Sequence, residues 1–242
     1  MKSKEILLRK LLKIMRTTAY ILFFLILTSC NSKLSNYYNS KAEKLEAEGK
    51  YKEAIVLLNK AIEKNPQNIY GLMNRGVDKS LLKDYKGAIE DYSRIIEIDE
   101  DNALAYLNRG KNKKRLKDYK GAIEDFDRAI KTKGGEFLYM DWSENSFVKN
   151  RFEFDVKMEE IRFERGFARY DIDSLRTSLT DFNFCIQKNF ELSTSYYMVG
   201  LIHIAYGNTD KGCKMLIKSK ELGDLDAQEM IDEYCKNNVM KE

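Results

Sequence analysis

The sequence predicts an all-α fold built from repeated pairs of antiparallel helices. Proline, the strongest helix breaker, occurs once in 242 residues, and charged residues make up 33% of the chain. Similar residues also recur every 34 residues, a period typical of stacked helix pairs. The segments KDYKGAIEDY (83–92) and KDYKGAIEDF (117–126) are nearly identical at this interval.

The small residues of this period explain how two helices pack within one unit. Ala42, Gly76 and Gly110 share one position of the repeat, and Ala54, Ala88 and Ala122 share another. We expect the first set to lie midway along each first helix, where the second helix crosses closely. The alanines then fill the other half of the contact. Leu58, Tyr92 and Phe126 lie four residues further on, on the same helix face.

These positions resemble the tetratricopeptide-repeat (TPR) family, and Pro66 matches the proline that follows its second helix. The resemblance implies a right-handed α-solenoid of about five helix pairs plus a C-terminal capping helix. The segment ELGDLDAQ (221–228) is also similar to Sel1-like repeats. The predicted organisation is three repeats over 35–136, an aromatic-rich insertion at 137–158, two degenerate repeats over 159–226 and a capping helix over 227–242.

The N-terminus is predicted to be an export signal. Basic residues precede nine apolar residues, Ala19–Leu27, a run that is too short to span a bilayer but suits a signal peptide. Leu27-Thr28-Ser29-Cys30 follows and resembles the lipobox of bacterial lipoproteins. That resemblance implies removal of residues 1–29, acylation of Cys30 with fatty acids such as palmitate, and a short tether over 30–34. An ordinary signal peptide with an incidental cysteine and an uncleaved anchor are the alternatives. Met15 is an alternative start to Met1.

Charge excludes a general nucleic-acid-binding role. The whole chain carries a formal charge of +4, but six of its 42 basic residues and one of its 38 acidic residues lie in residues 1–29. The remainder carries −1, so it lacks the basic excess that nucleic-acid binding needs. We expect an envelope protein, facing the periplasm or the cell surface, whose partners are proteins.

Catalytic and cofactor motifs are not found in the sequence. His203 is the single histidine, it has apolar neighbours, and we expect it to pack within its helix. Metal sites need clustered donors, and no histidine pair or CxxC motif occurs. We therefore predict a non-enzymatic protein with no cofactor and no metal.

Two cysteines near the C-terminus are candidates for a disulfide. Cys213 lies in the second helix of the fifth repeat and Cys235 in the capping helix. Consecutive helices of this fold pack side by side, and an oxidising compartment permits the bond. The alternative is two free buried thiols. Cys185 occupies the repeat position of Ala129, so we expect a small buried residue there.

The TPR resemblance implies that first helices line a concave groove that binds a peptide or a helix of a partner. The positions that face the partner are the second, fifth, ninth, twelfth and thirteenth of each repeat. Among the residues at these positions of repeats two and three, the predicted contact residues are Tyr70, Met73, Val77, Leu107, Lys111, Lys114 and Arg115. The alternative for Lys111, Lys114 and Arg115 is that they only form a solvated helix face.

The insertion is the second candidate site. It holds Tyr139, Phe147 and the single tryptophan, Trp142, and exposed aromatic residues often mark binding surfaces. They are equally explained as packing that fills the break between repeats three and four. We expect FEFDV (152–156) to form a short strand. The predicted function is therefore a lipid-anchored interaction scaffold. A binding module for a small ligand or glycan, using residues 137–158, is the alternative.

Overall fold

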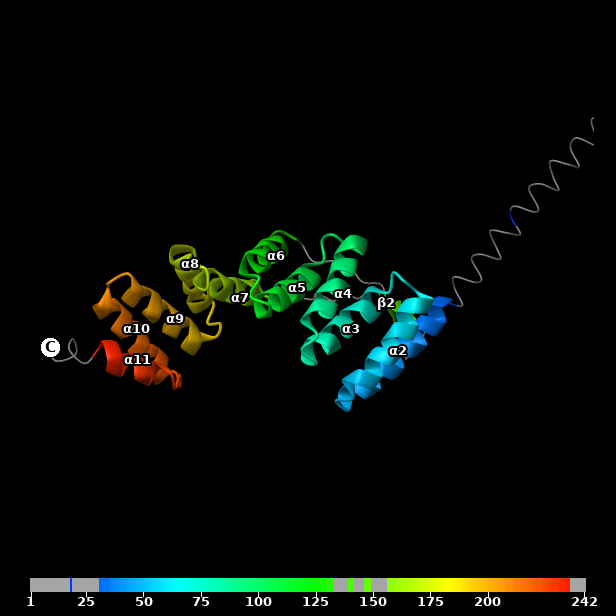
Figure 1. Cartoon of the computed structure of the whole chain (residues 1–242), viewed down its shortest axis with the longest axis horizontal. Helices are drawn as coiled ribbons and strands as arrows, with labels where there is room; N and C mark the ends of the chain where they lie inside the picture. Colours follow the sequence, from blue (N-terminus) through cyan, green and yellow to red (C-terminus); the bar gives the residue numbers. More distant parts are fainter. Residues whose placement is uncertain (1–17, 19–30, 133–138, 142–145, 149–155, 236–242) are drawn as a thin grey trace, which may run out of the picture. The chain divides into compact units, whose positions relative to one another are not determined.

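Helices follow one another in pairs along the chain (Figure 1). The computed structural model describes residues 18, 31–132, 139–141, 146–148 and 156–235. The successive pairs are residues 31–47 with α2 (Tyr51–Lys64), α3 (Ile69–Leu81) with α4 (Tyr85–Ile98), α5 (Ala103–Arg115) with α6 (Tyr119–Lys131), α7 (Met158–Tyr170) with α8 (Leu175–Gln187) and α9 (Leu192–Ala205) with α10 (Thr209–Glu221), followed by α11 (Ala227–Tyr234). The predicted fold of consecutive helix pairs is confirmed.

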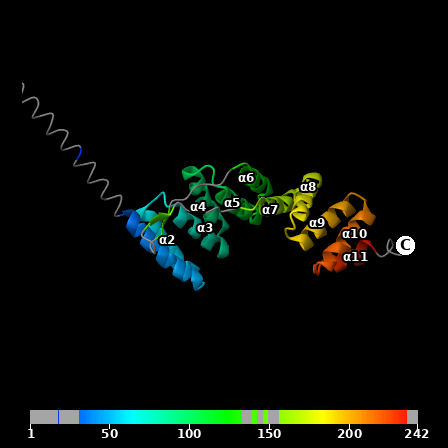
Figure 2. The same ribbon diagram turned by 180° about the vertical axis from the view of Figure 1, so that it is seen from behind.

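The chain divides into two compact units between Asp91 and Tyr92, a boundary that lies within α4. The first unit holds residues 31–47, α2, α3 and the beginning of α4. In the second unit, α5 packs on α6, α7 on α8, and α9 on α10. Figures 1 and 2 both show α11 beside α10, against which it packs.

The turn inside each helix pair has one recurring conformation. Its fifteenth repeat residue adopts the left-handed region of φ in all five pairs: Gly49, Lys83, Lys117, Asp173 and Gly207. This conformation is strained for residues with a Cβ, and glycine removes the strain. Side chains cap the N-termini of three helices. Asn68 at the start of α3, Asn102 at the start of α5 and Asp118 at the start of α6 each accept a hydrogen bond from a backbone N–H of the first helical turn.

The core of each pair lies where a small residue allows close helix contact. A Cβ added to Gly110 would lie 2.7 Å from Cε1 of Phe126 and 3.2 Å from the carbonyl oxygen of Ala122. In the fourth repeat, Ser178 replaces the expected alanine. Its buried hydroxyl donates a hydrogen bond of 2.8 Å to the Gly166 carbonyl oxygen, so a polar residue occupies the position without an unpaired group.

The N-terminal signal and Cys30 lie outside the described residues. Residues 31–34, which we expected to form a tether, are instead the first turn of the helix over 31–47, and their side chains are exposed. The first buried side chain is Ser35, whose hydroxyl donates to the Ala61 carbonyl oxygen at 2.7 Å. None of the described helices is both long enough and apolar enough to cross a membrane.

The insertion contains two short antiparallel strands, β1 (Tyr139–Asp141) and β2 (Ser146–Val148). Met140 lies opposite Phe147 in their register. Trp142 and most of the predicted strand over 152–156 lie outside the described residues. The strand over 152–156 therefore stays a prediction, and β1 and β2 are two strands that the sequence analysis did not predict.

Candidate interaction surface

A series of buried ion pairs fixes the first helices of repeats two to four. In each of these repeats an arginine of the first helix pairs with an aspartate sixteen residues later, on the second helix. The pairs are Arg75–Asp91, Arg109–Asp125 and Arg165–Asp181, with N···O distances of 2.5, 2.7 and 2.6 Å. Each aspartate is almost fully buried and also accepts a second cation: Lys79, Lys113 or Arg169. We name this set the Arg–Asp ladder.

The ladder also connects neighbouring repeats within a unit. A second guanidinium nitrogen, Nη1, donates to the preceding second helix: Arg109 to Ser93 Oγ at 3.0 Å, and Arg165 to Asp127 Oδ1 at 2.6 Å. Planar, two-pronged arginine–carboxylate pairs fix orientation as well as distance. The interval of sixteen residues was present in the sequence and would have revealed these pairs. The ladder carboxylates do not belong to a solvated helix face, because they are buried between paired cations.

The predicted basic end of the partner groove is paired within the chain. Nζ of Lys111 lies 2.6 Å from Glu160 Oε1, and Nζ of Lys114 lies 2.5 Å from Glu164 Oε2, both on α7. The two lysines therefore face the next first helix. They are largely neutralised and do not form a free cationic patch. Arg115, next to them, is exposed.

Two predicted contact residues are buried and are corrections to the sequence analysis. Leu107 retains 1% of its exposure and belongs to a core cluster with Phe126 and Ile161. Met73 is also buried, at 5%. The positional rule selects the face of one helix, whereas packing of the adjacent helices decides how much of that face reaches solvent. Tyr70 is half-buried and its hydroxyl donates to a carboxylate oxygen of Glu43, while Val77 is exposed.

The second unit presents an aromatic face that the sequence analysis missed. It consists of half-buried side chains on two first helices: Phe163, Phe167 and Tyr170 on α7, with Tyr197 and Leu201 on α9. We call these five residues the aromatic face. They occupy the fifth, ninth and twelfth positions of repeat four and the fifth and ninth of repeat five. The rule used for repeats two and three would have selected them if it had been extended to the degenerate repeats.

Ring contacts hold the α7 part of the aromatic face against the core. The ring centroids of Phe163 and Phe167 are 5.0 Å apart in an edge-to-face arrangement, and Phe167 lies 5.1 Å from the buried Phe182. The Lys114 ammonium lies 5.2 Å from the Phe167 ring centroid, within the range of a cation–π contact.

On α9, burial and then the carboxylates of Asp226 and Asp224 raise the pKa of Tyr197, so its hydroxyl stays protonated.

Carboxylates gather in the first unit on the helix over residues 31–47 and on α3. Burial first, and then the charges of Asp78 and Glu43, raise the pKa of Glu46 to about 7. Burial raises the pKa of Asp78 to about 6. Oε1 of Glu46 and Oδ2 of Asp78 are buried and have no hydrogen-bond partner among the described residues. Protonation relieves the cost of holding such groups in a partly dry environment.

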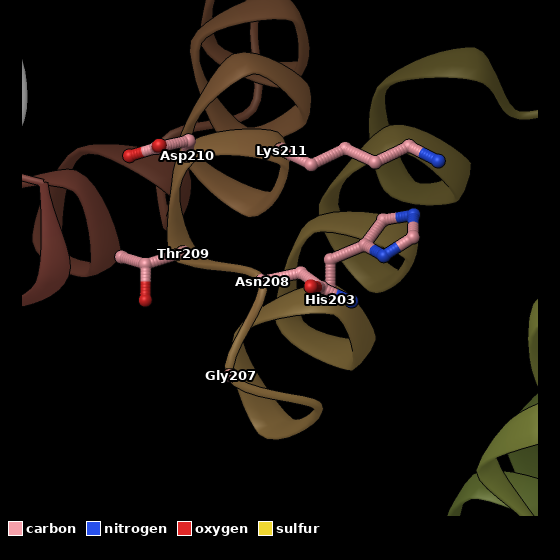
Figure 3. Close-up of a pocket in the computed structure, with 6 residues that line it drawn as sticks. All are labelled: His203, Gly207, Asn208, Thr209, Asp210 and Lys211. Carbon is pink, nitrogen blue, oxygen red and sulfur yellow. The ribbon is translucent and has the colours of Figure 1, made fainter.

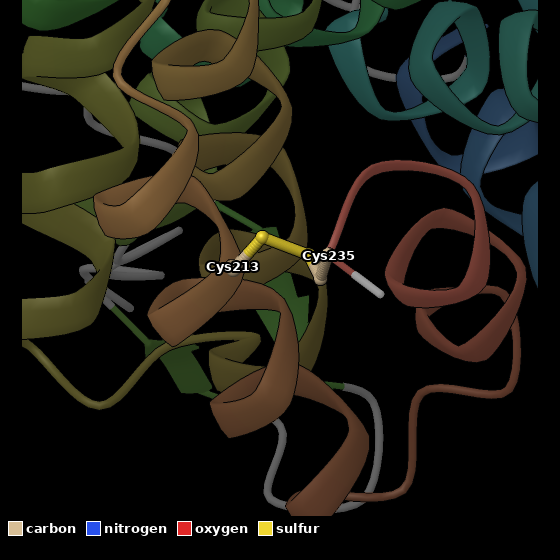
Figure 4. The surroundings of a disulfide bond; sticks show 2 residues. All are labelled: Cys213 and Cys235. Carbon is tan, nitrogen blue, oxygen red and sulfur yellow. A yellow bond between two sulfur atoms is a disulfide. The ribbon is translucent and has the colours of Figure 1, made fainter. Parts of the chain in front are cut away.

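The structure joins Cys213 of α10 to Cys235, the residue that follows α11, in a disulfide with a Cα–Cα separation of 5.7 Å (Figure 4). Both residues are buried and pack with Leu216, Met230 and Ile231.

Cys185 is a buried free thiol, and burial raises its pKa to about 12. Its thiol lies 3.4 Å from the Glu159 carbonyl oxygen. No cluster of three metal-binding side chains occurs in the described part of the chain.

Comparison with known proteins supports the helix-pair architecture. Residues 103–134 match the family model of the tetratricopeptide repeat. The fold is that of tetratricopeptide-repeat proteins. A crystal structure of MamA superposes with a TM-score of 0.64 at 17% identity, covering 84% of this chain and 96% of MamA.

Further solved structures agree on the fold. MamA residues 41–end from Desulfovibrio magneticus RS-1 gives a TM-score of 0.64 at 13% identity, covering 78% of this chain and 94% of that chain. YrrB, a TPR protein with an unusual peptide-binding site, gives a TM-score of 0.63 at 18% identity, covering 81% of this chain and 90% of YrrB. Sequence comparison with curated proteins finds no match. At these identities the likeness concerns the fold alone.

Proposed function

We propose that this protein is a protein-interaction scaffold that binds an apolar segment of a partner through the aromatic face of its second unit. The observation that carries the proposal is the row of half-buried aromatic side chains on α7 and α9. Aromatic residues are enriched at binding hot spots because they bury a large area at little cost in side-chain entropy. The peptide-binding site of the structurally similar YrrB supports the same class of function.

The packing around this face suits recognition because it is already ordered. The ion pairs Lys111–Glu160 and Lys114–Glu164 connect α5 to α7, and the Arg–Asp ladder holds α7 to α8. A partner therefore does not have to order these helices when it binds, which lowers the free-energy cost of association. The partner segment is expected to be apolar or aromatic, since the nearby lysines already have carboxylate partners.

The two half-buried tyrosines of the aromatic face provide the test. Crosslinking in the native envelope followed by mass spectrometry identifies a partner, and calorimetry with the purified partner then measures its affinity. The double variant Tyr170→Ser/Tyr197→Ser is expected to bind at least about tenfold more weakly, a loss of roughly 1.4 kcal/mol. Tyr206→Ser is the matched control, because Tyr206 is exposed and lies outside the face, at the end of α9.

A deletion variant separates this proposal from ligand recognition by the insertion. Deletion of residues 137–155, which keeps the core contact of Val156 and all of α7, should leave binding unchanged; loss of binding on deletion would instead support ligand recognition by the insertion. Charge reversal at Lys114 is a poor test, because it would also break the ion pair with Glu164. Unchanged affinity of the double tyrosine variant contradicts the proposal.

We further propose that a lipid on Cys30 anchors the scaffold to the bacterial envelope. The basis is the apolar run Ala19–Leu27 followed by Leu27-Thr28-Ser29-Cys30. Several acyl chains on one cysteine would give stable membrane binding, whereas a single chain gives only marginal binding. Metabolic labelling with a fatty-acid analogue tests this directly. Label is expected in the wild-type protein and not in Cys30→Ala, and equal labelling of both would remove the proposal.

A further inference from the structure

A polar pocket lies at the turn between α9 and α10 (Figure 3), and none of the aromatic-face residues lines it. It has a volume of about 710 Å³ and is lined by His203, Gly207, Asn208, Thr209, Asp210 and Lys211. Its floor includes the beginning of α10, where the first-turn N–H groups have no acceptor within the helix. Asn208, the N-cap residue, does not accept a side-chain hydrogen bond from them.

His203 is the buried polar group of this pocket. It retains only 7% of its exposure, and its Nδ1 atom has no hydrogen-bond partner among the described residues. A buried nitrogen without a partner costs free energy, so it needs an explanation. Figure 3 shows the Lys211 side chain extending on the same side as the His203 ring, whereas Asp210 and Thr209 point to the other side.

Comparison with the other repeats shows that His203 lacks the carboxylate partner of the equivalent residues. In repeats two and three the equivalent residues are Lys79 and Lys113. Each lysine donates to the carbonyl oxygen eight residues later and pairs with the aspartate twelve residues later. In repeat five these two positions are occupied by Lys211 and Met215. The carboxylate of the ladder is therefore replaced by an apolar side chain, while a basic residue is added beside the histidine.

We infer that this pocket binds a small oxyanion, a phosphate or carboxylate group, between Lys211, His203 and the N-terminus of α10. Three features favour an anion: the Lys211 ammonium, the partial positive charge of the helix N-terminus, and a histidine that becomes a cation when protonated. Lys211 forms no ion pair within the part of the chain that the structure describes. Asp210 is the single carboxylate among the lining residues. The site is separate from the aromatic face and does not depend on the proposed function.

The single histidine of the chain makes the site directly measurable. Without an anion, burial and then the Lys211 charge lower the pKa of His203. An oxyanion held beside the ring would favour the imidazolium form and raise this pKa. The experiment follows the one histidine Cε1–H signal by NMR during pH titration of the full chain, purified with a tag that lacks histidine. Titrations in inorganic phosphate, acetate and chloride are compared at equal ionic strength.

The expected result is a His203 pKa about one unit higher in phosphate than in chloride. This anion-dependent shift should fall by at least about half in Lys211→Gln and persist in Lys214→Gln, a neighbouring exposed lysine of α10. A shift in phosphate alone identifies a phosphate group as the ligand, and a shift in acetate as well extends the site to carboxylates. No shift with either anion, or the same shift in Lys211→Gln, overturns the inference. Far-UV circular dichroism checks that both variants are folded.

Discussion

Arg109 and Asp125 form a two-pronged ion pair across α5 and α6. Nε and Nη2 of Arg109 donate to Oδ2 and Oδ1 of Asp125 at 2.9 and 2.7 Å. Lys113 approaches the same carboxylate at 2.9 Å, and Asp125 is almost completely buried. One buried acid thus neutralises two partly buried cations, so its removal leaves both without compensation.

Replacing this acid should strongly destabilise the second unit. For Asp125→Ala we expect the free energy of unfolding to fall by about 3 kcal/mol, because two desolvated cations lose their partner. Chemical denaturation followed by circular dichroism measures the loss. Glu124→Ala is the matched control: it is the exposed adjacent residue on α6 and should change stability by less than about 0.5 kcal/mol. Equal effects of the two substitutions would contradict a structural role for the ladder.

The glycine at the helix crossing should not tolerate a methyl group. In Gly110→Ala the new Cβ meets the ring of Phe126 at 2.7 Å and the Ala122 backbone at 3.2 Å. Overpacking of this kind costs about 2 kcal/mol and exceeds the gain in helix propensity of about 1 kcal/mol. Gly166→Ala is the comparison, because its nearest contact is Phe182 at 3.0 Å. Thermal unfolding should show the larger loss for Gly110→Ala, and a gain in stability there would contradict the close crossing.

The disulfide should fix α11 to the last helix pair. Thiol counting on unreduced protein without the signal segment, residues 31–242, is expected to find one thiol, Cys185, which reacts only after unfolding because it is buried with a raised pKa. Cys235→Ser should lower the free energy of unfolding by about 3 kcal/mol, the value expected for closing a loop of this length. Cys185→Ser separates loss of a buried thiol from loss of the bond. Three reactive thiols after unfolding without a reductant would show that Cys213 and Cys235 are not bonded.

The stability of the first unit should decrease as pH rises from about 4 to about 7. The pKa values of Glu46 and Asp78 are raised in the folded state, to about 7 and about 6. Between the unfolded and folded pKa values the folded state binds more protons, so deprotonation favours unfolding. Asp78→Asn removes one charge and lowers the repulsion on Glu46. The thermal midpoint of this variant should therefore depend less on pH between 5 and 8.

Glu53→Gln serves as the control for this pH effect, because Glu53 is an exposed carboxylate on α2. It should keep the wild-type difference between the midpoints at pH 5 and pH 8. If Asp78→Asn also keeps the wild-type difference between the thermal midpoints at pH 5 and pH 8, other groups cause the pH dependence.

The aromatic face lies at repeat positions that can be predicted from the sequence. The positions that predicted Tyr70 and Val77 in repeat two also identify Phe163 and Tyr170 in repeat four, once the 22-residue shift of the frame is applied. The frame of the later repeats was predicted from the sequence even though Ser178 and Gly212 replace the alanines, so the same positions were available there. The rule did not predict the burial of Leu107, because burial depends on which side chains of the next helix pack against it.

The sequence by itself determined the helix pairs, their period and the small residues at their crossings, because these features depend on spacing along one helix and its immediate neighbour. It also brought Cys213 and Cys235 together as a candidate pair, since their helices are consecutive. Only the tertiary structure decided that Lys111 and Lys114 pair with Glu160 and Glu164 across the insertion. The same holds for His203, whose Nδ1 atom is buried without a hydrogen-bond partner among the described residues. Such contacts join residues far apart in the chain, and the pattern of either segment alone does not contain them.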